Sequence, residues 1–130
     1  MIAVDTNIIV RALTRDDAEQ AQSSAALLAD NDVFIPITVV LETEWVLRHA
    51  YGYDRPLISA AFRALFGVSN IFVGEAVAVD NALRWYEEGL DFADALHLSL
   101  SQQCEALYSF DIRFNGKSPS ASAIPVREPA

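Results

Sequence analysis

The chain has 130 residues, of which 52% are hydrophobic and 21% are charged. This length and composition predict a single folded domain over residues 1–130 and exclude a disordered or low-complexity protein. Eighteen acidic and nine basic side chains give a net charge of −9, which argues against nucleic-acid binding through a broad cationic surface.

The cysteine content and the length of the apolar runs indicate the cellular compartment in which we expect the protein. The single cysteine, Cys104, rules out an intramolecular disulfide and a zinc site made of several cysteines, and we expect it to be a small buried hydrophobe. No signal-peptide pattern is present before Asp5, and no apolar run reaches the roughly 18 residues that a membrane-spanning helix needs. We therefore expect a soluble protein of the reducing cytoplasm.

Short apolar segments alternate with longer segments of helical periodicity along the chain. The expected strands are residues 1–4, 33–35, 71–73, 107–110 and 124–126. The expected helices are residues 7–13, 18–29, 39–49, 57–66, 75–88 and 91–104, with Thr38 as the N-cap of the third. Strands that alternate with helices predict an α/β fold whose mostly parallel sheet is covered on both faces.

Two acids follow predicted strands directly. Asp5 comes after residues 1–4, and Asp111 comes after residues 107–110. The carboxyl ends of parallel strands meet at one edge of a sheet, where ligands bind. We therefore expect Asp5 and Asp111 at the same edge.

Glu42 lies near the start of the helix expected at residues 39–49. It shares a helix face with Trp45 and His49, so we expect its side chain on the packed side. The plainer alternative is an acid that favours the positive end of the helix dipole and reaches solvent. Glu44 is expected at the surface and Trp45 in the core, although a tryptophan here could also stack on a base.

Asp91 and Asp94 are one helical turn apart at the start of the helix expected at residues 91–104. Asp91 can serve as the N-cap with Asp94 near N3, which is a structural alternative to ligand binding. No Lys or Arg lies within one turn of Asp94 in the sequence, so its charge needs a partner from elsewhere.

Asp5, Glu42, Asp94 and Asp111 thus come from separate segments that this architecture gathers at one edge. Clustered carboxylates repel one another, and a divalent cation removes that conflict. Oxygen ligands without cysteine suit Mg²⁺ or Mn²⁺ better than zinc. A site of this kind is suited to hydrolysis of a phosphate ester by metal-activated water.

Four short motifs also carry a family resemblance: residues 5–9 (DTNII), 41–48 (LETEWVLR), 91–96 (DFADAL) and 109–111 (SFD). In order and separation they resemble the acidic motifs of the PIN-domain family, and more narrowly those of the VapC-type ribonuclease toxins of type II toxin–antitoxin pairs. The resemblance covers essentially the whole chain. It implies an α/β/α sandwich with a central sheet of four or five strands and the activity of a metal-dependent endoribonuclease.

The resemblance also implies roles for particular residues. The acids that catalyse the reaction and bind one or two Mg²⁺ or Mn²⁺ ions are Asp5, Glu42, Asp94 and Asp111. Asp91 is implied as a further metal ligand, and Thr6 and Asn7 as supporting residues. RNA is the implied substrate, a homodimer the implied assembly, and a cognate antitoxin with a basic segment the implied partner.

Basic residues flank the first and last acidic motifs and could contact RNA phosphates on either side of the acids. Ordinary surface cations explain them equally well. These residues are Arg11, Arg15, Arg113 and Lys117.

Three other functions fit an acidic α/β pocket. An aspartyl phosphatase would use Asp5 as its nucleophile, but such enzymes usually have a second Asp two positions later, where this chain has Asn7. A phospho-acceptor receiver domain needs a lysine after a late strand, whereas Lys117 lies in an expected loop. A catalytically silent PIN-like binding module stays an alternative, against which the intact set of four acids speaks.

Overall fold

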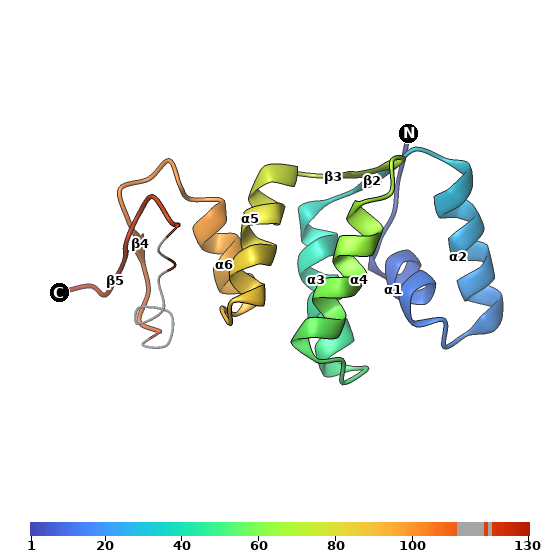
Figure 1. Ribbon diagram of the computed structural model, residues 1–130, viewed down its shortest axis with the longest axis horizontal. Coiled ribbons are helices and arrows are strands. Elements are labelled where there is room, and N and C mark those ends of the chain that lie inside the picture. Colours follow the sequence, from blue (N-terminus) through green and yellow to red (C-terminus); the bar gives the residue numbers. More distant parts are fainter. Residues whose placement is uncertain (112–118, 120) are drawn as a thin grey trace. The chain divides into compact units, whose positions relative to one another are not determined.

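The computed structural model describes residues 1–111, residue 119 and residues 121–130. The described chain divides into two compact units, Met1–Ala76 and Val77–Ala130, whose elements are labelled in Figure 1. The single domain expected over residues 1–130 stays a prediction.

The first unit is built on a parallel sheet. Strands β1 (Ile2–Ala3), β2 (Val33–Ile35) and β3 (Ile71–Val73) pair in parallel, with β2 in the middle. Val33 and Ile35 are fully buried, as expected for apolar residues in the central strand of a parallel sheet.

Helices α1 (Thr6–Thr14), α2 (Ala18–Asp30), α3 (Ile37–His49) and α4 (Arg55–Phe66) accompany this sheet. α1 packs against α2 and α3, and α3 packs against α4. Their apolar faces supply much of the core of this unit. The buried side chains include Ile9, Val10, Val40, Leu47, Ile58 and Phe62.

Aspartates begin α1, α2 and α4. The carboxylates of Asp5, Asp17 and Asp54 accept a hydrogen bond from the backbone N–H three residues on, a donor that the helix itself leaves unpaired. α3 begins differently, because Pro36 occupies its N-cap position in an extended conformation without a side-chain hydrogen bond. The prediction of Thr38 as the N-cap is therefore wrong, since the helix starts directly after the proline.

The second unit contains α5 (Ala76–Glu87), α6 (Phe92–Ser99) and two parallel strands, β4 (Leu107–Tyr108) and β5 (Val126–Arg127). A buried aromatic contact and a polar contact join its two helices. The aromatic contact is between Tyr86 and Phe92, whose rings meet edge to face with their centroids 5.2 Å apart. The polar contact is a hydrogen bond of 2.6 Å from Ser99 Oγ to the carbonyl of Ala78.

α6 ends at Ser99 rather than at residue 104. Leu100 is its C-cap, and the chain then turns, with Ser101 Oγ donating to the carbonyl of His97 at 2.7 Å. Cys104 is exposed. The expectation of a buried Cys104 is wrong because the helix that would have carried it into the core stops one turn earlier.

The α/β class and the parallel sheet are confirmed, and each predicted strand overlaps an observed one. The strands differ from the expectation in their grouping, because three form the sheet of the first unit and two form a pair in the second. Among the described residues, none of the helices combines the length and the apolar character that crossing a bilayer requires.

Candidate active site

Asp5 and Glu42, the first two acids of the predicted site, are linked through Thr6. Asp5 follows β1 and caps α1, where its Oδ1 accepts the N–H of Ile8 at 3.3 Å. Thr6 is only 7% exposed, and its Oγ1 donates a hydrogen bond to Oε1 of Glu42 on α3. Two consecutive residues at the start of α1 thus supply the first acid, Asp5, and the hydroxyl that binds the second acid, Glu42.

Within the described part of the first unit, neither Asp5 nor Glu42 forms an ion pair with a lysine or arginine. Their donors are a backbone N–H and a hydroxyl. By contrast, Asp16, Glu44 and Asp80 each face an arginine. Asp5 and Glu42 are also exposed, so a cation from solution can reach both carboxylates.

The other predicted acids lie in the second unit. Asp91 is the N-cap of α6 and accepts the N–H of Asp94 at 3.2 Å, which confirms the capping interpretation. Asp94 is half-buried in the first turn of α6. Asp111 is half-buried after β4, and its N–H donates to Oγ of Ser109 at 3.0 Å.

The predicted four-acid site therefore draws on both units, with Asp5 and Glu42 from the first and Asp94 and Asp111 from the second. Within either unit by itself, the described residues contain no group of three His, Cys, Asp or Glu side chains able to hold a metal ion. The gathering of all four acids remains a prediction.

The outward face of α3 differs from the expected one. Glu42 and Trp45 are exposed, Trp45 to 55%, whereas Glu44 is only 1% exposed. The expectations of a packed Glu42, a core Trp45 and a surface Glu44 are therefore wrong, because the helix turns a different face to the core. That buried face consists of Val40, Thr43, Glu44 and Leu47.

Arg48 explains how Glu44 tolerates burial. Its Nε donates to Oε2 of Glu44 at 2.7 Å from one helical turn away. The Arg48 side chain itself stays 39% exposed, so the guanidinium remains partly hydrated while it neutralises the buried acid. An acid with an arginine four positions on can therefore face the core.

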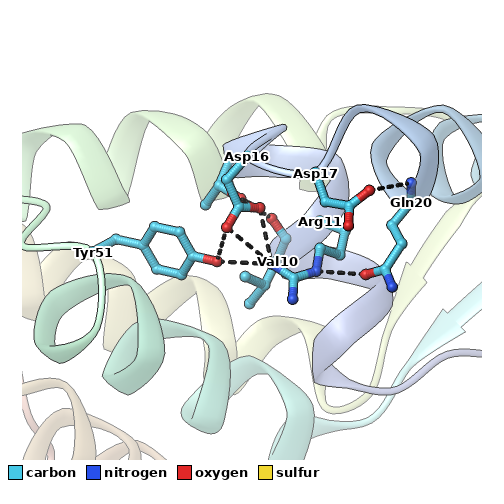
Figure 2. A network of polar contacts seen from close by, with 7 residues as sticks. Val10, Arg11, Asp16, Asp17, Gln20 and Tyr51 are labelled. Atoms are coloured by element: carbon cyan, nitrogen blue, oxygen red, sulfur yellow. Dashed lines mark hydrogen bonds and ion pairs between the residues drawn. The ribbon is translucent and has the colours of Figure 1, made fainter.

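Arg11, in the last turn of α1, is the centre of a polar network in the first unit (Figure 2). Its Nη1 donates to both carboxylate oxygens of Asp16 at 2.9 Å, and its Nε donates to Oε1 of Gln20 at 2.7 Å. Tyr51 donates its hydroxyl to Asp16 at 2.7 Å. The network joins α1, the start of α2 and the segment between α3 and α4.

These contacts change the acidity of Asp16. The hydrogen bond from Tyr51, together with those from Arg11 and Thr14, lowers the pKa of Asp16 from 3.8 to about 2. The hydrogen bond to Asp16 in turn raises the pKa of Arg11. Sequence patterns could not reveal this contact, because Tyr51 and Asp16 are 35 positions apart.

The basic residues expected to contact RNA have different surroundings. A phosphate at Arg11 has to compete with the carboxylate of Asp16. Arg15 is exposed at the C-cap of α1, with a left-handed φ of 57°. Arg113 and Lys117 lie outside the described residues. The RNA-binding role of these residues remains a prediction.

A groove of about 850 Å³ runs between α1 and α2 in the first unit. It begins at Asp5, and its walls carry three acids against one arginine, Arg11, which is already paired with Asp16. The groove is therefore acidic. Its lining residues are Asp5, Asn7, Ile8, Arg11, Asp17, Glu19, Gln20, Ser23, Ser24 and Leu27.

Residues 2–117 match the family model of the PIN domain. The chain belongs to the PIN domain family. PIN domains are generally metal-dependent nucleases, and the match spans all four acidic motifs. A comparison with curated proteins finds no match for this chain.

The donor set of this PIN domain suits a hard divalent cation. Asp5 and Glu42 offer carboxylate oxygens, which Mg²⁺ and Mn²⁺ prefer. The Thr6 hydroxyl engages one oxygen of Glu42 and orients the carboxylate, as residues behind metal ligands commonly do. Asn7 lies beside them, exposed in the first turn of α1.

Thr6→Val tests whether this PIN domain uses Thr6 to orient Glu42. The substitution removes the hydroxyl and keeps the branched shape, so we expect Mn²⁺ affinity to fall about 10- to 100-fold in isothermal titration calorimetry. Thr6→Ser keeps a hydroxyl and is expected to bind Mn²⁺ nearly as tightly as the wild type. Equal affinity in Thr6→Val and the wild type would show that this hydrogen bond orients no metal ligand.

Tyr51→Phe removes the largest cause of the low pKa of Asp16, so we expect that pKa to rise from about 2 toward 3.8. Because folding lowers this pKa, ionised Asp16 stabilises the fold above 3.8, and the stabilisation is lost as the pH falls toward 2. The variant should therefore melt at a lower temperature than the wild type at pH 7, with the difference shrinking toward pH 2.

Carboxyl NMR titration and melting temperatures across this pH range measure both effects. Tyr53→Phe is the matched control, because its ring meets that of Tyr51 edge-on with centroids 6.0 Å apart, while the Tyr51 hydroxyl stays in place. An unchanged titration of Asp16 in Tyr51→Phe would contradict the assigned cause.

Proposed function

We propose that this PIN domain is an endoribonuclease that depends on Mg²⁺ or Mn²⁺ and acts in the cytoplasm as the toxin of a VapC-type toxin–antitoxin pair. The family supports a nuclease, and the resemblance of the four motifs supports the narrower class. The observation that carries the proposal is that Thr6 links Asp5 and Glu42, two exposed acids that pair with no lysine or arginine in the described part of the first unit. Asp16 and Glu44 are instead paired with arginine.

We assign catalysis and the binding of one or two divalent ions to acids of both units. The chemistry that such an ion supplies is a water of lowered pKa and a positive charge beside the phosphate. Asp91 is a further ligand in this proposal, besides its role as N-cap of α6. The four principal residues are Asp5, Glu42, Asp94 and Asp111.

The residues around these acids have distinct tasks in the proposal. Thr6 fixes the orientation of Glu42, and Asp5 fixes the start of α1 by accepting the N–H of Ile8. Asn7 offers an exposed amide beside Asp5, where it can donate to an RNA phosphate. Arg15 is the described cation that we assign to a flanking phosphate, since Arg11 is engaged by Asp16.

The partner we propose is a cognate antitoxin that lays a basic segment in the groove between α1 and α2. The acids in its lining, Asp5, Asp17 and Glu19, complement such a segment, and Ile8 and Leu27 offer apolar contact. A basic segment that reaches Asp5 would compete with the metal ions for the same carboxylate. We also propose a homodimer, for which the motif resemblance is the support.

An aspartyl phosphatase is less well supported. The Asp5 carboxylate accepts a hydrogen bond from its own helix, and Asn7 stands where such enzymes usually have a second Asp. The PIN family match also favours a nuclease.

We expect the purified protein, freed of any antitoxin, to cut mixed RNA with Mg²⁺ or Mn²⁺ and to leave 5′-phosphate and 3′-hydroxyl ends. Asp5→Asn and Glu42→Gln remove a charged ligand and should lower the cleavage rate at least about 100-fold. Gel analysis of the fragments and mapping of their ends measure the outcome.

Asp54→Asn is the matched control, because it makes the same change of charge at the N-cap of α4. We expect it to cut RNA at the wild-type rate. Failure of the wild type to cut RNA with either ion, or undiminished cleavage by Asp5→Asn, would refute the mechanism and favour a silent binding module.

Expression of the protein should arrest bacterial growth, and co-expression of a small adjacent gene product should restore it. Glu19→Lys reverses a charge in the groove and should weaken antitoxin affinity about tenfold, measured by calorimetry. Asp30→Lys, at the end of the same helix but outside the groove lining, is the control and should leave affinity unchanged. Equal affinity of both variants would place the antitoxin elsewhere.

A further inference from the structure

One exposed stripe of α3 combines the proposed metal ligand with two aromatic rings. Thr38, Glu42, Trp45 and His49 are all exposed and recur at intervals of three and four residues, so they share one helix face. The ring of Trp45 lies beside that of His49, with centroids 4.6 Å apart and planes inclined by 40°. Trp45 therefore presents a large ring, supported by a second ring, one turn beyond Glu42.

The charge of the protein limits how it can hold RNA. Binding through phosphates requires lysine and arginine, and this chain has nine of them against eighteen acids. Three of the described arginines, Arg11, Arg48 and Arg84, form ion pairs with carboxylates. Contacts that do not depend on charge must then contribute to affinity, and base stacking on an aromatic ring is the main contact of that kind.

We infer that Trp45, supported by His49, is a stacking platform for an unpaired RNA base next to the phosphate that is cleaved. This inference rests on the proposed ribonuclease function and assigns one residue of its substrate contact. Trp45 follows Glu42 by three residues, which is a rise of about 4.5 Å along the helix. That separation places the ring within reach of a nucleotide adjacent to the one whose phosphate lies at Glu42.

The composition of the stripe favours a nucleobase over an apolar protein surface. Its exposed members are a hydroxyl, a carboxylate and two flat rings, without an exposed aliphatic side chain among them. His49 in the last turn of the same helix adds an imidazole, while Arg48 is engaged by Glu44. Exposed flat rings suit stacking on a base.

The two tryptophans of the chain allow a direct test, because Trp85 is only 5% exposed. Trp85→Phe leaves Trp45 as the single tryptophan, and Trp45→Phe leaves Trp85, so excitation that selects tryptophan over the four tyrosines reports one ring at a time. We expect a single-stranded RNA decamer of mixed sequence, added in EDTA, to quench fluorescence in Trp85→Phe and not in Trp45→Phe. EDTA prevents cleavage, so the measurement reports binding alone.

Affinity for the same decamer, labelled and followed by anisotropy, gives a second measurement. Trp45→Ala should weaken binding about fivefold or more, while Trp45→Phe, which keeps a ring, should remain close to the wild type. The slope of affinity against salt should be the same in both variants, because stacking releases no counterions.

Several outcomes would overturn the inference. One is RNA that binds without quenching Trp45, and another is equal binding by Trp45→Ala and Trp45→Phe. A shift of Trp45→Ala from dimer to monomer in sedimentation, with Trp45 shielded from acrylamide before RNA is added, would assign the face to a protein interface. If the wild type cuts RNA while Trp45→Ala binds and cuts equally well, only the stacking role fails; if the wild type neither binds nor cuts, the proposed function fails too.

Discussion

The hydrogen bond from Thr6 to Glu42 is the contact on which the candidate site of the first unit depends. A buried hydroxyl of α1 loses its hydrogen bonds to water, so it needs an acceptor, and a carboxylate is a strong one. The bond joins the chain directly after β1 to the middle of α3. It therefore orients the Glu42 carboxylate beside the start of α1.

Arginines pair with some acids of this protein and not with the first two acids of the proposed site. Asp16, Glu44 and Asp80 are neutralised by arginines, and these pairs stabilise local structure. Asp5 and Glu42 receive hydrogen bonds from neutral donors within the described residues. In the proposed nuclease, a cationic ligand would be the counterpart of these two side chains.

Much of the architecture could be predicted from the sequence, because short apolar runs such as residues 33–35 have few alternatives to a buried strand. The capping role of Asp91 could also be predicted, since it depends on residues three positions apart. The rotation of α3 could not, because both of its faces contain apolar and charged residues, and a Glu44–Arg48 pair can form within the helix whichever face is buried. Contacts such as Tyr51 with Asp16 depend on the folded chain and leave no local pattern.

The burial of Glu44 shows how α3 is rotated about its axis. Glu42 and Glu44 are two residues apart, so they point about 200° away from each other around the helix axis. The Glu44–Arg48 pair lies within one helix, so it would move as a unit if α3 rotated. The burial of Val40 and Leu47 on the same face as Glu44 favours the observed rotation, which turns Glu42 and Trp45 toward solvent.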